Sequence, residues 1–335
     1  MPHDSSGVKC GANTRASMEK RLRTGVIGVG KMGANHARVY HELDGCDLVG
    51  VYDADRGRAR QLAKALGCRA FPTLTGLYHA GLDAVSVAVP TSLHAEVVVD
   101  AFTNGLHILV EKPIASSLEE AAFMIDAAEK ANRTFMVGHI ERFNPAVLAV
   151  KEAVAPDDII SVNVVRVGPR PPRIKDAGVI IDMAVHDIDL VHYLTEKHVE
   201  AVHCVSSSHF DVFEDTASIL LRMAGGASAQ ITANWITPYK AREIQVVTAE
   251  KLLRANLLTQ HVQESSRFDG DDMSYVVRDM YVRHREPLRS QLQAFLGAVR
   301  GGMAPPITGE DGRRVLDVAI QAVSQKQITP LRVAS

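Results

Sequence analysis

The sequence predicts an α/β protein: an N-terminal doubly wound parallel sheet, followed by an α+β domain with a large open, mostly antiparallel sheet. Three observations support this prediction. Strand-like and helix-like segments alternate over residues 22–139, the pattern of a parallel sheet with helices on its faces. A glycine-rich turn follows the first strand. After about residue 143, strand-like segments follow one another with few helices between them, which is typical of an antiparallel sheet.

The glycine-rich turn has the spacing Gly28-x-Gly30-x-x-Gly33 and leads into a helical segment. In dinucleotide-binding folds, the first glycine of this motif allows a tight turn and the second lets backbone approach a pyrophosphate. The third lets the helix pack on the strand. The next strand ends in Asp53, where a carboxylate binds a ribose hydroxyl and repels a 2′-phosphate. The motif predicts NAD as the cofactor, with NADP disfavoured; an ordinary glycine-rich turn is the alternative.

The ends of the later strands supply further candidates for cofactor binding. The apolar run 84–89 suits a parallel strand buried on both faces and ends at Pro90. Strands are also expected over 107–110 and 134–137. Because doubly wound sheets bind ligands beyond the carboxyl ends of their strands, we assign cofactor binding to residues at these ends: Gly28, Gly30, Lys31, Met32, Gly33, Asp53, Pro90, Thr91, His94, Glu111 and Lys112.

The composition narrows the class of protein. The chain has 335 residues, of which 46% are hydrophobic and 23% charged, ordinary values for a globular protein. The net charge of −2 gives no reason to expect nucleic acid or an anionic membrane as a partner, and no apolar stretch is long enough to span a bilayer. The four cysteines lack a C-x-x-C pair, so we expect no metal site and a cytoplasmic location.

Glu111-Lys112-Pro113 ends the strand over 107–110. The Lys112 side chain would then point into the crevice, where desolvation and nearby positive charge lower the pKa of a lysine. The proline fixes the turn and is able to form a cis peptide bond. A surface lysine after a strand is the alternative interpretation.

Asp182 and His186 lie four residues apart in a segment with a helical pattern, so they share one helix face. A histidine beside a carboxylate is a candidate general base, because its pKa lies near working pH. The alternatives are a surface ion pair and a structural histidine. A metal site is weaker, since His186 and His192 lack the spacing of paired helical ligands.

A basic loop over 166–175 precedes this helix. Together with Arg142, its arginines could hold a diphosphate through bidentate hydrogen bonds, although a solvated basic loop is an equal alternative for each residue. We assign substrate binding to Arg142, Arg166, Arg173, Asp182 and His186.

These motifs, in this order, resemble the Gfo/Idh/MocA oxidoreductases, and the resemblance extends from about Arg21 over nearly the whole chain. It implies an NAD-binding Rossmann domain over 21–142, after a mobile tail over 1–20. It also implies a substrate-binding and oligomerisation domain over 143–335, and hence a homodimer or homotetramer. Carried over to this sequence, the family's catalytic groups are Lys112 of the Glu-Lys-Pro motif and the pair Asp182 and His186.

The segments 138–145, 167–174 and 179–189 resemble the branch of the family that oxidises the 3-hydroxyl of UDP-N-acetylglucosamine. The resemblance implies that His186 takes the hydroxyl proton, Lys112 stabilises the developing negative charge, and Asp182 orients His186 or the sugar. Which of Lys112 and His186 finally holds the proton stays open. A dehydrogenase of inositol or a free sugar is the first alternative. A non-catalytic NAD-sensing regulator is the second, and the intact catalytic residues argue against it.

Replacing Arg173 tests the diphosphate interpretation. Pro171-Pro172 stiffen the approach to Arg173, and a charge-assisted hydrogen bond contributes about 1.5–3 kcal/mol. Arg173→Ala should therefore raise the KM for the UDP-sugar by roughly 10–100-fold and leave kcat little changed. The kinetics with free N-acetylglucosamine should be the same for the wild type and the variant. Steady-state kinetics with both sugars measure this. Equal effects on the two sugars, or none on either, would move the polyol alternative ahead.

Overall fold

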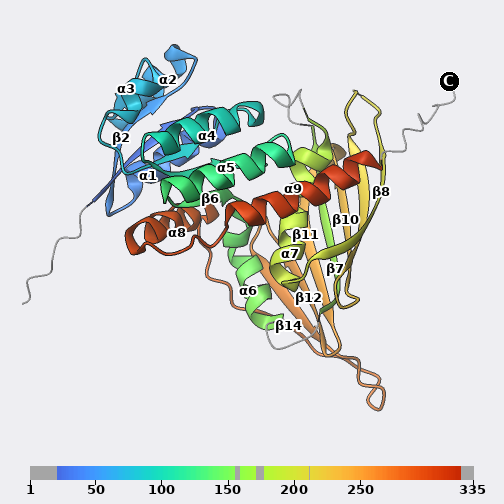
Figure 1. The fold of residues 1–335 in the computed structure, drawn as a ribbon. Coiled ribbons are helices and arrows are strands. Elements are labelled where there is room, and N and C mark those ends of the chain that lie inside the picture. The colour runs from blue at the N-terminus through green and yellow to red at the C-terminus, as the bar shows by residue number, and fades with distance from the viewer. Residues whose placement is uncertain (1–20, 155–158, 171–176, 211, 326–335) are drawn as a thin grey trace, which may run out of the picture.

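The computed structural model describes residues 21–154, 159–170, 177–210 and 212–325. They form two sheets with helices around them (Figure 1). Each sheet has its own hydrophobic core. No helix in these described ranges is both long enough and apolar enough to cross a membrane.

The first sheet has six parallel strands in the order β3-β2-β1-β4-β5-β6. The order reverses between β1 and β4, the point at which Rossmann-type sheets bind their ligand. The strands are β1 (Leu22–Ile27), β2 (Cys46–Tyr52), β3 (Arg69–Ala70), β4 (Ala84–Val87), β5 (His107–Glu111) and β6 (Phe135–Gly138). The helices between them are α1 (Lys31–Glu42), α2 (Arg56–Leu66), α3 (Leu74–Tyr78), α4 (His94–Thr103) and α5 (Leu118–Ala131), with a 3₁₀ turn η1 (Thr91–Leu93) before α4.

The boundaries of these helices follow from local chemistry. The Asp55 side chain accepts hydrogen bonds from two backbone N–H groups at the start of α2, and Gly67 ends that helix with φ +65°. The Ser117 side chain caps α5 by accepting from the N–H of Glu120. The Glu120 carboxylate accepts from the N–H of Ser116, one residue before the position that a capping box uses.

The second sheet has eight strands in the order β14-β13-β12-β11-β7-β10-β9-β8. The pairs are antiparallel except β7 with β10, which confirms the mostly antiparallel sheet. The strands are β7 (Ile159–Pro169), β8 (Val199–Ser207), β9 (Thr216–Met223), β10 (Ser228–Asn234), β11 (Ile236–Thr248), β12 (Lys251–Asn256), β13 (His261–Ser266) and β14 (Val277–Asp279). The associated helices are η2 (Ile140–Phe143), α6 (Pro145–Val154), the π-helical η3 (Ile180–Ala184), α7 (Val185–Thr195), α8 (Pro287–Gly301) and α9 (Gly309–Ser324).

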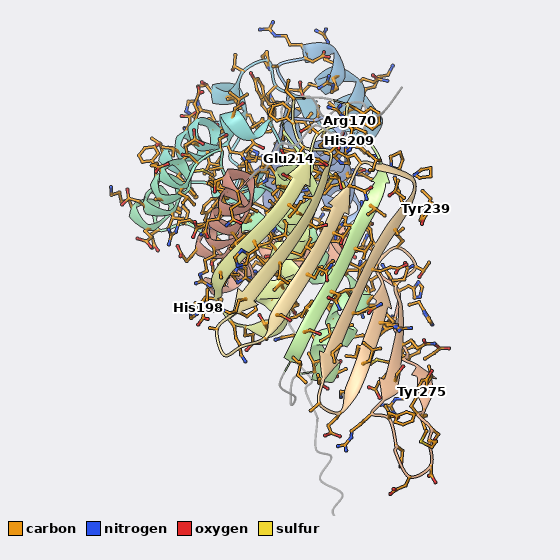
Figure 2. The ribbon with its side chains drawn as sticks, turned by 90° about the vertical axis from the view of Figure 1, so that its right-hand side faces the viewer. Arg170, His198, His209, Glu214, Tyr239 and Tyr275 are labelled. Atoms are coloured by element: carbon orange, nitrogen blue, oxygen red, sulfur yellow. The ribbon has the colours of Figure 1, made fainter. Side chains whose placement is uncertain are left out.

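Helices α6, α7 and α9 lie on one face of the second sheet (Figure 1). No helix among the described residues covers the opposite face (Figure 2). Along β9, buried and more exposed residues alternate strictly, because successive side chains point to opposite faces of a strand.

The last two helices connect the two sheets. Side chains of α8 belong to the first core, whereas α9 contributes to both cores. A Cβ at Gly309 would lie 2.9 Å from the Phe135 ring, and one at Gly312 would lie 2.9 Å from Val137, so these glycines let α9 approach β6 closely. The chain thus returns to the first core after residue 286. The domain boundary expected at 142/143 stays a prediction.

Two parts of the fold differ from the expectation. The sequence did not predict α3 or strands β12, β13 and β14; α3 is one short turn, and half of β13 lacks clear alternation between buried and exposed residues. The prediction that a basic loop begins at residue 166 is also wrong, since β7 continues to Pro169.

Candidate active site

The glycine turn has the geometry of a pyrophosphate cradle. Gly28 has φ +83°, and a Cβ there would lie 2.7 Å from the backbone of Ala88. A Cβ at Gly33 would lie 1.8 Å from the Gly28 carbonyl oxygen, whereas one at Gly30 would meet nothing within 4 Å. No side chain caps the N-terminus of α1, where Lys31 is exposed and Met32 half-buried. The turn therefore fits a dinucleotide, whose pyrophosphate the N-terminal N–H groups of α1 would hold.

Asp53 lies beside this turn in a fixed orientation. Its Oδ2 accepts from the N–H of Val29 at 2.7 Å and its Oδ1 from that of Asp55 at 2.8 Å. Nη1 of Arg58, on α2, lies 3.5 Å from Oδ2. The sequence analysis did not identify Arg58 as a neighbour of Asp53, because it lies beyond the end of the strand, in the first turn of the next helix.

His94 is buried and bonded to backbone. Its Nδ1 lies 3.0 Å from the carbonyl oxygen of Pro113, and its Nε2 lies 3.1 Å from that of Val89. Burial lowers the pKa of His94. A neutral imidazole has one N–H, so His94 donates to only one of these carbonyl oxygens. It lies between the segments that follow β4 and β5, next to Pro90 and Thr91 at the start of η1.

Lys112 connects the two sheets. Its Nζ donates to the backbone carbonyl of Asp182 at 2.6 Å and to Oδ1 of the same residue at 3.2 Å. The peptide bond between Lys112 and Pro113 is cis. Asp182 comes from the π-helical turn beside the second sheet, so two motifs 70 residues apart in the sequence meet in one site.

His186 lies in the first turn of α7, and Glu214 holds the start of this helical segment. The N–H of Val179 donates to the backbone carbonyl of Glu214 at 2.9 Å, and that of Ile180 donates to the carboxylate at 3.3 Å. Figure 2 shows Glu214 at the end of the second sheet that faces the first. The sequence analysis missed Glu214, because the β8–β9 connection carries no motif.

The electrostatic surroundings keep His186 neutral. Burial is the largest cause that lowers its pKa well below the ordinary value, and the positive charges of Lys112 and Arg166 lower the pKa further. Nδ1 of His186 has no hydrogen-bond partner within the described residues. Asp182 bonds to Lys112 rather than to His186. The site therefore combines an imidazole able to accept a proton with a lysine ammonium that donates hydrogen bonds.

The arginines assigned to a diphosphate need correction. Arg166 is only 1% exposed, and its guanidinium pairs with Asp187 at 2.7 Å and Glu141 at 2.9 Å. Nε and Nη2 of Arg142 both donate to the buried carboxylate of Asp189, with Nη2 2.7 Å from Oδ1. Both charges are already neutralised within the protein, which removes the reason to assign them to substrate. Arg173 lies outside the described residues.

Arg242 on β11 is a cation that the sequence analysis missed. It is opposite Arg166 in the sheet. Its Nη1 lies 3.4 Å from Oε1 of Glu141, and its side chain is 41% exposed to solvent. Burial and the charge of Arg166 lower its pKa, while the charge of Asp182 raises it. Arg242 therefore lies near Asp182 and has a partly exposed side chain.

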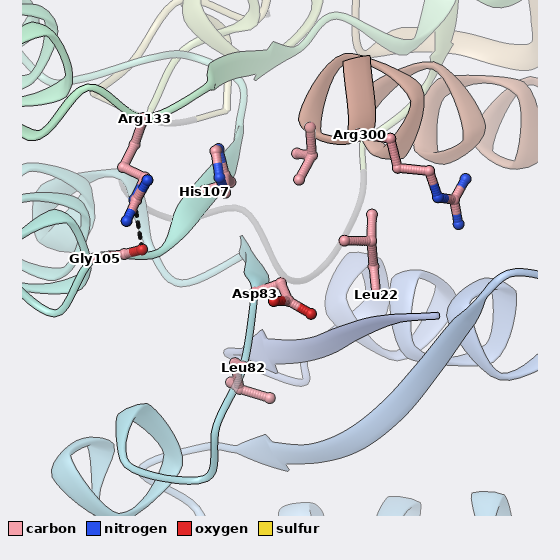
Figure 3. Close-up of a pocket in the computed structure, with 8 residues that line it drawn as sticks. Leu22, Leu82, Asp83, Gly105, His107, Arg133 and Arg300 are labelled. Carbon is pink, nitrogen blue, oxygen red and sulfur yellow. Dashed lines mark hydrogen bonds between the residues drawn. The ribbon is translucent and has the colours of Figure 1, made fainter. Parts of the chain in front are cut away.

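A hollow of about 620 Å³ (Figure 3) lies away from this site. It is bordered by the amino ends of β1 and β5, with His107, Arg133 and Arg300 among its polar residues. Ligands of doubly wound sheets bind at the opposite, carboxyl ends, so the hollow is not the candidate active site. Within the described ranges, no group of three or more metal-binding side chains comes together.

Comparison with known families gives two matches. Residues 22–139 match the Gfo/Idh/MocA "Oxidoreductase family, NAD-binding Rossmann fold". Residues 157–254 match the "GFO/IDH/MocA C-terminal domain". Together the two matches cover more than half of the chain.

Individual relatives are similar over their whole length. The chain is 33% identical to UDP-N-acetylglucosamine 3-dehydrogenase of Acidithiobacillus ferrooxidans, over 90% of this chain and 96% of the relative. It is 29% identical to scyllo-inositol 2-dehydrogenase (NAD(+)) of Bacillus subtilis, over 92% and 94%. A solved structure of the Acidithiobacillus ferrooxidans enzyme superposes with a TM-score of 0.86 at 30% identity, covering 91% of this chain and 97% of that one.

Cofactor selectivity should depend on Asp53. We expect the wild type to have the higher kcat/KM with NAD, because the Asp53 carboxylate repels a 2′-phosphate. Asp53→Asn keeps an acceptor for the Val29 N–H but removes the charge, and Asp53→Ser also shortens the side chain. Both should raise the ratio of kcat/KM for NADP over NAD by about tenfold or more, since Arg58 then becomes free to bind phosphate. A wild-type preference for NADP would contradict the assignment.

Turnover should depend on His186. His186→Ala should lower kcat by roughly 10²–10⁴-fold, the usual contribution of general acid–base catalysis. The NAD dissociation constant should stay near the wild-type value, because the glycine turn lies on the other sheet. Single-turnover kinetics and NAD titration measure the two effects. Turnover within a few-fold of wild type would make His186 structural and leave Lys112 as the proton acceptor.

Proposed function

This chain belongs to the Gfo/Idh/MocA oxidoreductases, and we propose that it oxidises the 3-hydroxyl of UDP-N-acetylglucosamine to the 3-keto sugar. The family makes it an NAD-dependent dehydrogenase of sugars or polyols. The observation that carries the choice of substrate is the full-length similarity, in sequence and in fold, to the UDP-N-acetylglucosamine 3-dehydrogenase of Acidithiobacillus ferrooxidans.

The roles proposed for the site residues follow from their contacts. Bound NAD supplies the hydride acceptor. The neutral imidazole of His186 takes the proton of the sugar hydroxyl. Lys112 donates a hydrogen bond to the oxygen as negative charge develops on it. Because Lys112 Nζ is bonded to Asp182 through both the side chain and the backbone, we assign to Asp182 the orientation of Lys112 rather than that of His186.

For recognition of the diphosphate, we keep Arg173 as a candidate and replace Arg142 and Arg166 by Arg242. Arg142 and Arg166 are paired with carboxylates. Arg242 lies near Asp182 and has a partly exposed side chain, and a guanidinium suits bidentate contact with phosphate oxygens. Arg242 and Arg173 are therefore the candidates for this role.

A polyol such as inositol is the second candidate substrate. The inositol dehydrogenases among the relatives are nearly as similar to this chain as the nucleotide-sugar enzyme, and the pairing of Arg142 and Arg166 removes part of the argument for a diphosphate. A non-catalytic NAD sensor is disfavoured, because it gives the contact between Lys112 and Asp182 no role. The cytoplasmic location and the homodimer or homotetramer remain predictions.

Isotope-labelled substrates test the proposal. NADH formation is measured with UDP-N-acetylglucosamine, free N-acetylglucosamine and myo-inositol. The nucleotide sugar should have a kcat/KM at least about 100-fold above the other two, since remote binding energy is lost without the diphosphate. Deuterium at C3 of its sugar should appear in the reduced cofactor, whereas deuterium at C4, the matched control, should stay in the sugar. Faster oxidation of myo-inositol, or transfer of the C4 deuterium, would overturn the assignment.

A further inference from the structure

A chain of hydrogen bonds runs through the core of the first sheet to the strand end that carries Lys112. The hydroxyl of Tyr40 lies 2.9 Å from Oγ of Ser86. That Oγ lies 3.0 Å from Nδ1 of His36, whose Nε2 lies 3.0 Å from Oε1 of Glu111. Tyr40, Ser86 and His36 are 0% exposed, and Glu111 is 8% exposed. The mechanism given above uses none of these four residues.

The proton positions in this chain follow from what each group is able to donate. An ionised Glu111 only accepts, so Nε2 of His36 carries a proton and donates it. With a neutral imidazole, Nδ1 accepts from the hydroxyl of Ser86, and Ser86 accepts from the hydroxyl of Tyr40. Each of these contacts then has one donor and one acceptor. Burial raises the pKa of Tyr40, which keeps the phenol protonated at the far end of the chain.

The groups around Glu111 favour its anion. His36 faces it from α1, His94 from α4 and Lys112 from its own strand end, while His139 lies after β6. Burial raises the pKa of Glu111, but the hydrogen bond from His36, with smaller contributions from Lys112 and His94, brings the net pKa below its ordinary value. His36 is therefore the neighbour that most favours a carboxylate at this buried position.

We propose that His36 is a positioning residue, whose hydrogen bond holds Glu111 as a carboxylate and thereby fixes the strand end from which Lys112 reaches Asp182. His36 lies on α1, three residues after Gly33, so it connects the helix of the glycine turn to the proposed catalytic lysine. The proposal rests on the role of Lys112 given above. A histidine that only fills space in the core is the alternative.

Three variants separate these possibilities. His36→Leu removes both hydrogen bonds at similar volume, and His36→Gln restores a donor toward Glu111. Val39→Ala is the matched control, because Val39 is a 0% exposed residue of the same helix outside the hydrogen-bonded chain. We expect kcat to fall by about tenfold or more in His36→Leu and to recover to within a few-fold of wild type in His36→Gln. Val39→Ala should lower stability and leave the kcat of the folded enzyme near wild type.

The pH dependence of stability gives a readout that needs neither substrate nor cofactor. In the wild type, the lowered pKa of Glu111 contributes stability above the unfolded value of about 4.3. Without His36, burial raises this pKa, so ionisation of Glu111 costs stability as the pH rises. Both His36 variants lack the imidazole, so His36→Gln is the reference for this comparison. The melting temperature of His36→Leu should therefore fall relative to that of His36→Gln between pH 4.5 and 7.5 by roughly 2–4 °C. The deficit of Val39→Ala relative to wild type should stay nearly constant.

A second background keeps the test decisive if His36→Leu alone folds poorly. In Glu111→Gln the carboxylate is absent, so the difference in melting temperature between added His36→Leu and added His36→Gln should no longer depend on pH. A difference between His36→Leu and His36→Gln that is constant with pH in the Glu111 enzyme, together with a kcat of His36→Leu like that of Val39→Ala, would show that His36 only fills space. If the wild type does not oxidise UDP-N-acetylglucosamine, the proposed substrate fails while the pH readout still tests His36.

Discussion

The contact between Lys112 and Asp182 is the interaction on which the site depends. It joins the carboxyl end of a strand in the first sheet to the first turn of the helix that packs on the second. The contact forms only if the two sheets have a fixed position relative to each other. Helix α9 meets that condition, because it contributes side chains to both cores and approaches β6 closely through two glycines.

Charge compensation governs which polar groups remain available near this contact. Arg166 is paired with Glu141 and Asp187 in the interior, and Arg142 is paired with Asp189. A buried charge is tolerated only when it is paired, so these ion pairs connect α7 to β7 and to η2. Burial, Lys112 and Arg166, in this order, lower the pKa of the His186 imidazole. Arg166, which was expected to bind a substrate, therefore acts on His186 through its charge.

Two buried histidines, on helices α1 and α4, contact the strand ends next to Lys112 in the first sheet. His94 lies between backbone carbonyls of the segments that follow β4 and β5, and His36 bonds to Glu111 one residue before Lys112. Each of these histidines is buried, so its hydrogen bonds are made inside the protein rather than with water. The strand end that carries the lysine is thus held from two helices.

The sequence by itself determined the α/β fold with its two sheets, the order of most of its elements and the motifs at the glycine turn, at Lys112 and at Asp182 and His186. These features depend on local periodicity and on turn chemistry, which a short window of residues contains. Only the tertiary structure decided that Arg142 and Arg166 are paired inside the protein, that Arg242 lies near Asp182, that Glu214 contacts the start of the catalytic helix, and that Asp182 meets Lys112. The partner of a charged side chain comes from a distant part of the chain, and burial, which sets its pKa and availability, exists only after the sheets have packed.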